Sequence, residues 1–280
     1  MSTEAAVLAQ PVSLAKAIAS PRYLAWRRGQ RREGFTIRAI QVLLVVVLLA
    51  AWELGARMHW MNPMLTSYPS AIWFGLRAMV LEGTLGSHLS VTLVEVSISF
   101  ILAMALGTTL AVLLWLSPRA ERVMDPFLVV ANALPKVALV PIFYIWLGPE
   151  LSIYGIAVAI AVFIVALMIF TGFRQTDPNK IKLVRTLGAS RAQMLSKVVL
   201  PGSVPTLIAA MKANAALSLV GVIVGEFQSG KAGLGYLITY DSQIFQMDRV
   251  MVSVVLLGVI SLAMYVAIQG LEALLMGRRK

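Results

Sequence analysis

The sequence predicts an all-α, polytopic membrane protein with six transmembrane helices and with both chain ends in the cytoplasm. Of its 280 residues, 59% are hydrophobic and 13% are charged, whereas soluble domains carry about 25% charged residues. A helix that crosses a membrane needs about 20 mostly apolar residues. Six stretches reach that length, and we predict a span for each of them: residues 38–58, 90–116, 126–147, 151–173, 206–227 and 250–276.

The distribution of positive charge orients these spans. Eighteen of the 24 Lys and Arg residues lie in the first 38 residues, at positions 119 and 122, in residues 174–201 and in the last three residues. Lys and Arg resist translocation, so these four regions are predicted to be cytoplasmic. The net charge of +11 is then explained by topology and by contact with anionic membrane lipid, and it does not indicate a nucleic-acid partner.

Ahead of the first span, residues 1–37 are predicted to form a cytoplasmic tail, and residues 38–280 form the membrane domain. Part of the tail is either a short helix on the membrane surface or a loosely ordered chain, and the sequence leaves both open. The first span is too long for the core of a signal peptide and no cleavage site follows it, so we expect it to be retained. The chain has no cysteine, which excludes disulfides and thiol catalysis.

Proline and glycine mark irregular places within the later spans. Pro135 and Pro141 interrupt the stretch 126–147, so its middle is predicted to be kinked or partly unwound. Backbone that is unpaired at this depth is tolerated only inside the protein or along a wet cavity. In the fifth span, Gly221 and Gly225 allow a close helix contact, and packing within the subunit is favoured over a dimer contact.

Residues 228–247 are too polar and too rich in glycine to cross the membrane, so we predict a dip into the outer face that contains a short helix. The stretch GEFQSGKA at 225–232 is similar to a phosphate-binding loop, but Ala232 lacks the hydroxyl that would hold magnesium and no strand precedes it. The two histidines, His59 and His88, form no zinc-spaced cluster, and no GxSxG motif occurs. We therefore expect no catalytic residue, no metal site, no cofactor and no enzymatic activity in this chain.

The most informative stretch is Arg174–Pro201, which reads RQTDPNKIKLVRTLGASRAQMLSKVVLP. It contains six Lys or Arg residues and a single acid, Asp177, between two long apolar runs. Its spacing is typical of a helix with Leu183, Leu187 and Met194 on one side and the cations largely on the other. An ordered polar helix on the cytoplasmic side of a membrane protein indicates a docking surface for a partner.

This stretch resembles the cytoplasmic loop of ABC-importer permeases, whose pattern is EAA, three residues, Gly, nine residues, Ile, one residue and Leu-Pro. The matching positions are Gly188, Val198, Leu200 and Pro201. Three further blocks are similar to the nitrate, sulfonate, taurine and bicarbonate branch of this family: RTLGAS at 185–190, ALPKVALVPIFYIWLG at 133–148 and KAGLGYLI at 231–238. The resemblance covers residues 69–278, and the chain departs from the pattern at the EAA triplet, which is Lys182, Leu183 and Val184.

The resemblance implies that residues 174–201 contain a coupling helix, which lies in a groove of a separate ATPase and transmits its motion to the spans. Gly188 is expected to form a sharp turn between two short helices, and Pro201 to end the polar helix and begin the next span. The residues expected to couple to the ATPase are Arg185, Thr186, Leu187, Gly188, Ala189, Ser190 and Pro201.

The same resemblance implies three kinds of protein partner and a location. The partners are a second copy of this chain, two ATP-binding cassette subunits that hold ATP and Mg, and an extracytoplasmic substrate-binding protein. The location is the bacterial inner membrane, which the chain crosses several times.

Polar groups at membrane depth are costly and are therefore candidates for a translocation path. Lys136 either attracts an oxyanion or ties down the broken backbone of the third span, and both readings stay open. Lys212 is expected to extend its amine towards the cytoplasm. The residues that we assign to the path are Asn132, Lys136, Tyr144, Asn214 and Glu226.

The predicted function is that of the permease subunit of an ATP-driven importer for a small, anionic solute of the nitrate, sulfonate, taurine or bicarbonate kind. The alternative cargo within this family is a vitamin or a pyrimidine-type precursor. An ion-coupled secondary transporter is the alternative of another class. It would need its own coupling-ion site and an internal repeat, and the sequence contains neither.

Overall fold

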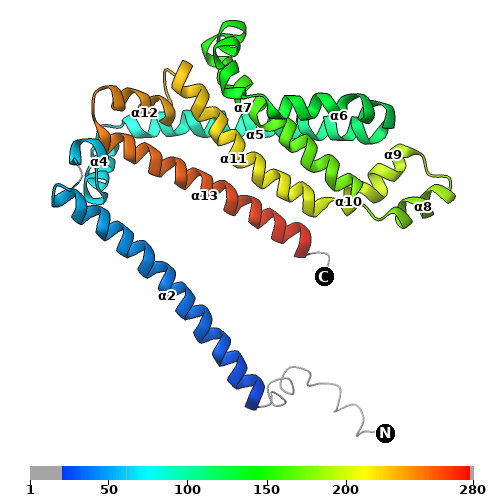
Figure 1. Ribbon diagram of the computed structural model, residues 1–280, viewed down its shortest axis with the longest axis horizontal. Helices are drawn as coiled ribbons and strands as arrows, with labels where there is room; N and C mark the ends of the chain where they lie inside the picture. Colours follow the sequence, from blue (N-terminus) through cyan, green and yellow to red (C-terminus); the bar gives the residue numbers. More distant parts are fainter. Residues whose placement is uncertain (1–20, 61, 278–280) are drawn as a thin grey trace, which may run out of the picture. The chain divides into compact units, whose positions relative to one another are not determined.

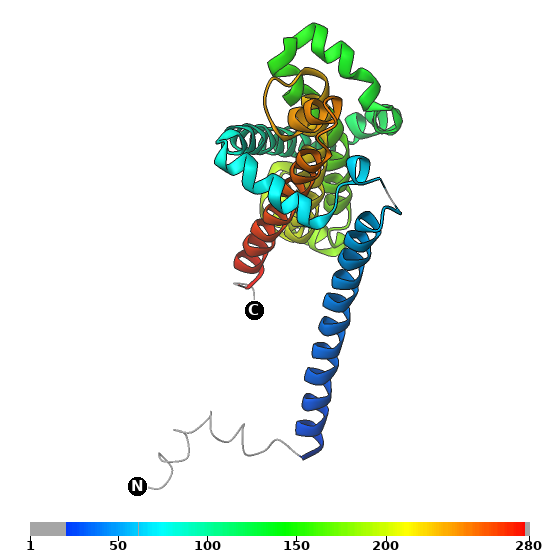
Figure 2. The same ribbon diagram turned by 90° about the vertical axis from the view of Figure 1, so that its left-hand side faces the viewer.

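The computed structural model describes residues 21–60 and 62–277, and within this part of the chain the regular elements are helices. The chain divides into two compact units, residues 1–63 and 64–280. Figures 1 and 2 show the course of the chain through these elements. The elements are α2 (Pro21–Arg57), α3 (Pro63–Thr66), α4 (Pro69–Leu81), α5 (Thr84–Leu116), α6 (Pro118–Ala133), the 3-10 turn η1 (Lys136–Leu139), α7 (Val140–Arg174), α8 (Pro178–Thr186), α9 (Arg191–Met194), the π turn η2 (Leu195–Val199), α10 (Leu200–Gly202), α11 (Val204–Ser229), α12 (Leu234–Gln243) and α13 (Met247–Gly277).

The first unit contains α2, one continuous helix of 37 residues. Its residues 33–57 are long and apolar enough to cross a membrane, which agrees with the first predicted span. The helix already begins at Pro21, because proline is favoured at a helix start and no further proline follows before Pro63. A loosely ordered tail is therefore wrong for residues 21–37, and residues 1–20 lie outside the described residues.

The second unit is built around α5, α7 and α11, which contact one another along much of their length. A Cβ atom added to Gly225 of α11 would lie 2.8 Å from the Cα of Ile153 on α7, and one added to Gly221 would collide with Ala157. Further along α7, a Cβ added to Gly107 of α5 would lie 2.7 Å from Val165. The prediction that the two glycines of α11 serve packing within the subunit is confirmed.

Two clusters of buried apolar side chains lie at the two ends of this bundle. One cluster joins α4, α12 and α13 to α5, α7 and α11, and it includes Met79, Leu234 and Val252. The other joins α6 and η2 to the same three long helices, and it includes Leu128 and Phe173. The polar segment that follows α7 and the short helix α12 are therefore anchored at opposite ends of the unit, as Figure 1 shows.

Five stretches of the described residues are long and apolar enough to cross a membrane, and the predicted third span, 126–147, is not among them as one helix. It is divided between α6, η1 and the start of α7, with extended backbone at Leu134 and non-helical backbone at Pro135. The predicted break at Pro135 is thus confirmed, because the residue before a proline avoids the helical region. Pro141 does not break the chain. It lies in the first turn of α7, where a missing N–H needs no partner.

Two short helices complete the unit at the end that contains α12. The predicted short helix in the dip after α11 is confirmed as α12. The apolar helix α4 has 13 residues and was missed by the sequence analysis because it is too short for a span. Two long-range contacts hold this end to the start of α13: Ser67 Oγ donates to Asp248 Oδ1 at 2.7 Å, and Arg249 Nη2 lies 2.5 Å from Glu82 Oε1.

We predict that the α12 end of the unit is extracytoplasmic and that the end with α8 and α9 is cytoplasmic. The 26 residues of α11 join these ends and span about 39 Å, more than the thickness of a bilayer core of about 30 Å. The chain has no cysteine, so a thiol reagent labels only the cysteine that is introduced. Gln246→Cys should react with a membrane-impermeant maleimide in intact cells, and Ser196→Cys should react only after permeabilisation. Both side chains are exposed. Labelling of Ser196→Cys in intact cells would contradict this orientation.

Candidate functional site

The polar segment Arg174–Pro201 folds into two short helices joined by a tight turn, as the sequence predicted. Asp177 starts α8, because its side chain accepts a hydrogen bond from the backbone N of Asn179 at 2.9 Å. Ser190 starts α9 with a capping box, in which it accepts from Gln193 N at 3.3 Å while Gln193 Oε1 accepts from Ser190 N at 2.8 Å. These side chains satisfy the N–H groups that the first turn of a helix leaves unpaired.

The turn between these helices is a glycine cap on the end of α8. Gly188 has φ of +84°, in the left-handed region that side chains with a Cβ rarely adopt. The Gly188 N–H donates to Arg185 O, and the Ala189 N–H donates to Val184 O, both at 3.0 Å. This pair of bonds is the Schellman arrangement, and it satisfies the last carbonyls of α8. The prediction of a sharp turn at Gly188 is confirmed.

The most exposed apolar side chains of the segment are Leu183 and Leu187, which are 62% and 78% exposed. Met194 was predicted to share their side, but it is only 4% exposed and lies against the bundle. That prediction is wrong because the turn at Gly188 interrupts the helical spacing on which it depended. Two leucines are thus largely exposed on a small, capped element. Such exposure is costly in water and indicates a surface that a partner covers.

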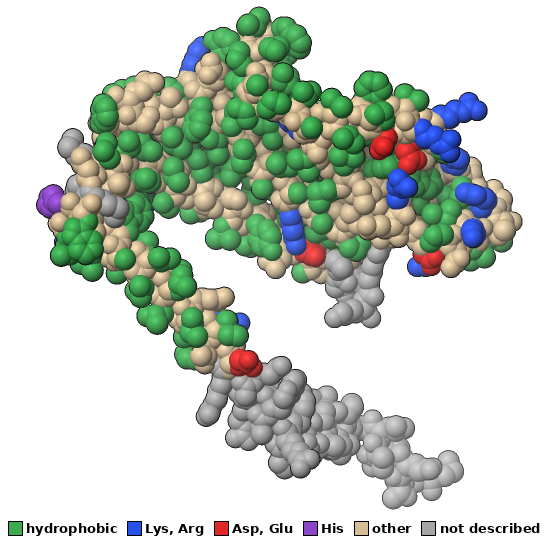
Figure 3. All heavy atoms as spheres, in the orientation of Figure 1, with side chains coloured by type: hydrophobic (Ala, Val, Ile, Leu, Met, Phe, Trp, Pro, Cys, Tyr) green, Lys and Arg blue, Asp and Glu red, His purple; other side chains and the backbone are tan. Residues whose placement is uncertain are grey.

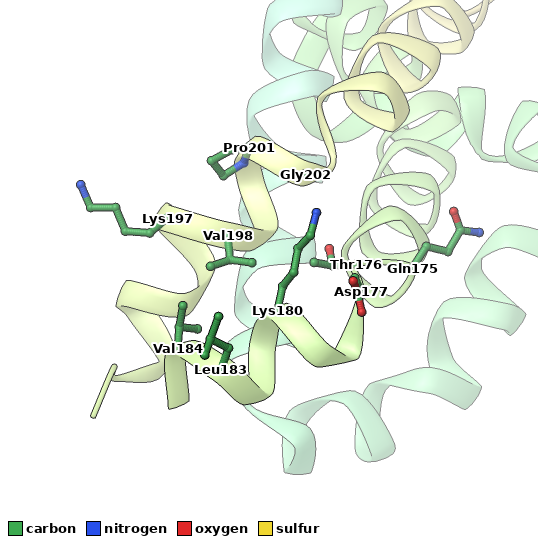
Figure 4. A pocket seen from close by; sticks show the side chains of 10 residues that line it. All are labelled: Gln175, Thr176, Asp177, Lys180, Leu183, Val184, Lys197, Val198, Pro201 and Gly202. Carbon is green, nitrogen blue, oxygen red and sulfur yellow. The ribbon is translucent and has the colours of Figure 1, made fainter. Parts of the chain in front are cut away.

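Behind α8 lies a cleft of about 540 Å³, which separates this helix from η2 and α10. In Figure 4 the side chain of Lys180 runs along the cleft beside Thr176 and Asp177, whereas Lys197 extends away from it. The cleft is lined by Gln175, Thr176, Asp177, Lys180, Leu183, Val184, Lys197, Val198, Pro201 and Gly202.

Pro201 lies within the second helical arm and changes its pitch. The residues before it form the π turn η2, in which Leu200 N donates to Leu195 O. Proline has no N–H to donate to Lys197 O and its ring crowds that carbonyl, which accounts for the wider turn. The arm ends at Ser203 rather than at Pro201, where the sequence analysis expected it.

The segment is held to the ends of the long helices by polar contacts. Arg191 Nη1 donates to the last-turn carbonyl of Leu116 on α5 at 3.0 Å. Arg174 Nη1 lies 3.2 Å from Glu121 Oε1 on α6. Ser203 Oγ donates to Gly172 O on α7 at 3.2 Å. A force on the segment is therefore transmitted to α5, α6, α7 and α11.

The surface of the segment is basic. Figure 3 shows Lys and Arg side chains gathered over the end of the unit that contains α6, α8 and α9. Lys180, Lys182 and Arg185 all belong to α8, and the only acid of the segment, Asp177, caps that helix. A partner surface that fits here therefore has an apolar floor for the two leucines and an acidic rim.

The residues predicted to line a translocation path are not brought together in this single chain. Lys136 Nζ donates to the backbone oxygen of Asn132 at 3.0 Å and lies 3.5 Å from its Oδ1. A cation beside the last carbonyls of α6 stabilises that helix end, which favours the reading that Lys136 ties down the broken backbone. Tyr144 lies exposed on the first part of α7.

The other two predicted path residues, Asn214 and Glu226, are buried in α11. Asn214 Nδ2 donates to Phe100 O on α5 at 2.8 Å, and its Oδ1 accepts from Ser218 Oγ at 3.2 Å. Within the described residues, the polar atoms of Asn214 are therefore already used in hydrogen bonds that join α11 to α5 and to its own next turn. Their place on a path stays a prediction, and it would require these bonds to open.

Glu226 joins the end of α11 to α12 and α5. Its Oε1 accepts from Thr92 Oγ1 at 2.8 Å, and its Oε2 accepts from Gly235 N at 2.5 Å. Thr92 Oγ1 in turn accepts from Leu234 N at 2.8 Å. A carboxylate at the first N–H groups of α12 acts as a cap supplied by the preceding helix. The sequence analysis missed this role because Thr92 is 134 residues away in the sequence.

Lys212 also has a partner that the sequence analysis missed. Its Nζ lies 2.6 Å from Glu272 Oε2 on α13 and 5.4 Å from the ring centre of Tyr265. This ion pair joins residues 60 positions apart in the sequence, which is why the sequence analysis missed it. The expectation that the amine extends towards the cytoplasm stays a prediction.

The chain is similar to known membrane transport proteins in sequence and in fold. The sequence model of a family described as "Binding-protein-dependent transport system inner membrane component" matches residues 103–280. The formylaminopyrimidine transport permease ThiX of Halalkalibacterium halodurans is 29% identical over 85% of this chain and 95% of its own length. The putative aliphatic sulfonates transport permease SsuC of Bacillus subtilis is 26% identical over 78% of this chain and 80% of its own. The inward-facing MetNI methionine ABC transporter has a chain of the same fold, with a TM-score of 0.57 and 17% identity over 68% of this chain and 97% of that chain.

We predict that the left-handed turn at position 188 requires glycine. Gly188→Val should lower the local stability of the turn by about 1–2 kcal/mol, because a β-branched residue is strained at this φ. The backbone amides of residues 188 and 189 should then exchange hydrogen with solvent roughly tenfold faster. Asn tolerates the conformation better, so Gly188→Asn should give a smaller change. Gly202→Ala is the control, because its Cβ would have no neighbour closer than 3.8 Å. Unchanged exchange in Gly188→Val would refute the requirement.

Proposed function

Because this chain belongs to the family of binding-protein-dependent transport system inner membrane components, we propose that its polar segment Arg174–Pro201 couples the membrane helices to a separate ATPase. The chain is a permease subunit of an ABC importer and crosses the inner membrane several times. ATP and Mg are bound by the ATPase subunits, and an extracytoplasmic substrate-binding protein delivers the solute.

The observation that carries the coupling role is the exposure of Leu183 and Leu187 on a segment that is otherwise firmly anchored. A loop that served only to connect two spans would not need a capping box, a Schellman turn and the attachment of Arg191 to the end of α5. The leucines insert into a groove of the ATPase, and the cations of α8 contact its rim. Arg185, Thr186, Ala189 and Ser190 surround the turn and fix its geometry.

The proposed motion follows from these attachments. When two ATPase subunits close on ATP, each carries its docked segment with it. Ser203 and Arg191 pass the displacement to α7, α11 and α5. The permease then changes between inward-facing and outward-facing states, which exposes the solute path to one side of the membrane at a time.

We propose that the working unit contains two copies of this chain. Two ATPase subunits each need a coupling segment, and one copy supplies only one. Large apolar side chains on α6 and the first part of α7, among them Phe127, Ile145 and Trp146, are more than half exposed in the single chain. Lipid and the second copy cover such surfaces in a membrane. The path then lies between the copies, near Asn132, Lys136 and Tyr144.

The proposed cargo is a small, anionic solute of the sulfonate kind. This follows the aliphatic sulfonates named for the Bacillus subtilis relative. A pyrimidine-type precursor is the second candidate, because the Halalkalibacterium relative carries the name of a formylaminopyrimidine permease. Uptake of each class, competed by the other, distinguishes them.

We expect Leu187→Asp and Leu183→Asp to abolish docking of the ATPase. Each places a charge in the apolar part of the contact, so copurification of the ATPase with the permease should fall by at least about tenfold. The amount of permease in the membrane should stay normal, because both side chains already lie outside its core. Ile244→Asp is the matched control, since Ile244 is 46% exposed at the opposite end of the unit. Normal copurification with Leu187→Asp would exclude the segment as the docking surface.

We also predict the outcome of removing the amine of Lys136. If it attracts the solute, Lys136→Ala should lower transport of an alkanesulfonate by about tenfold while the permease–ATPase complex still assembles. Lys136→Arg should restore part of the transport because it keeps the charge. Loss of the assembled complex in Lys136→Ala would instead identify the contact with Asn132 as a structural clamp and exclude the path assignment.

A further inference from the structure

We propose that α4 (Pro69–Leu81) is a membrane-surface helix, which lies in the headgroup layer of the bilayer and contacts phospholipid with its exposed face. A lipid phosphate binds the guanidinium of Arg77, and the upper part of the acyl chains contacts the aromatic rings beside it. The helix lies at the α12 end of the unit, opposite the polar segment Arg174–Pro201 (Figure 1). The proposal is therefore independent of the proposed docking to an ATPase.

The helix α4 is too short to cross a membrane. Its 13 residues extend about 20 Å, whereas the apolar core of a bilayer is about 30 Å thick. One face of α4 belongs to the core of the unit, because Met79 is fully buried there and Ile72 and Leu76 pack against the same cluster. The opposite face is left for a partner outside the chain's own core.

Polar contacts at both ends of α4 show how it lies on α13. Ser67, just before α4, donates to Asp248, and Glu82, directly after α4, pairs with Arg249. The two ends of α4 are about 20 Å apart, yet their partners are neighbouring residues of α13. The helix therefore lies across the start of α13 and does not run along it.

The place of this crossing is the boundary of the apolar span. The stretch Met247–Leu275 of α13 is long and apolar enough to cross a membrane, and its charged residues stand at its start. In the middle of α4, a Cβ added to Gly75 would lie 3.4 Å from Val252 Cγ2 in the second turn of α13. A helix that crosses a span at this level lies roughly parallel to the membrane, at the depth of the headgroups.

The exposed face of α4 has the composition of a membrane-surface helix. Trp73 and Phe74 are 65% and 64% exposed, and Leu81 is 78% exposed. Helical spacing places Arg77 on the same face, between Trp73 and Leu81. Arg77 is exposed, and among the described residues it forms no ion pair. Aromatic rings are enriched where a membrane meets water, and arginine extends its charge to the headgroups while its stem covers apolar surface.

Phospholipid fits this face better than a protein partner does. The helix contains no acid, and its single charge lies between apolar side chains. A protein that covered the face would bury the guanidinium and would need an acid opposite it, because an unpaired buried charge is costly. A phospholipid brings a phosphate to the same place, and its acyl chains accept the apolar side chains without a specific shape.

The test uses the full-length permease in vesicles of phosphatidylethanolamine and phosphatidylglycerol. Because the chain has no cysteine, a spin label reports only on the cysteine that is introduced. Labels on Phe74→Cys and Val80→Cys should collide more often with oxygen, which is enriched among acyl chains, than with a water-soluble nickel chelate. Gln246→Cys is the matched control, since it is exposed in the loop before α13, and its label should show the reverse preference.

Two results with these labels would overturn the proposal. A preference of the Phe74→Cys label for the nickel chelate would place the face in water. A label that collides with neither reagent would show that protein covers the face. Both side chains are already more than half exposed, so the labels do not disturb the core of the unit.

A change of charge at Arg77 tests the contact with the phosphate. Arg77→Glu should shift the Phe74→Cys label towards the nickel chelate, because the phosphates repel an acid, and Arg77→Lys should keep the original preference. Arg122→Glu is the matched control, since it makes the same change at an exposed residue of α6, at the other end of the unit. An unchanged preference in Arg77→Glu would refute the phosphate contact on which the proposal depends.

Discussion

The close contact between α7 and α11 is the constraint on which the other features of the second unit depend. At Gly221 and Gly225 the two helices approach so closely that a Cβ atom would meet the backbone of Ala157 or Ile153. In a membrane the hydrophobic effect does not drive helices together, so close packing of small residues provides the attraction. This contact fixes α11 along its length, and α11 connects the coupling segment to α12.

Each end of α11 then has a polar attachment that matches its role. At the end that is predicted to be cytoplasmic, Ser203 bonds to α7 directly after the polar segment Arg174–Pro201. At the other end, Glu226 receives N–H and O–H groups from α12 and α5. In the proposed mechanism, a displacement that enters at the polar segment reaches the opposite face through one packed helix.

The polar segment Arg174–Pro201 keeps the turn of the family's cytoplasmic loop although it departs from the EAA triplet of the pattern. Lys182, Leu183 and Val184 replace the usual triplet, and the segment has no acid available for the ATPase, since Asp177 caps α8. The turn at Gly188 and its capping bonds remain. The proposed contact therefore relies on exposed leucines with cations around them, which calls for an acidic rim on the partner.

The sequence by itself determined the features that have a local cause: the apolar lengths of five spans, the break at Pro135, the short helix after α11 and the left-handed turn at Gly188. Proline and glycine act through their own backbone, and a span is recognised by its length, so no distant residue is needed. Only the tertiary structure decided which polar side chains are partners. Lys212 meets Glu272 across 60 residues, and Glu226 meets Thr92 across 134. The structure also decided that Leu183 and Leu187 are exposed while Met194 is buried, because the turn at Gly188 redirects the chain and helical spacing does not continue through it.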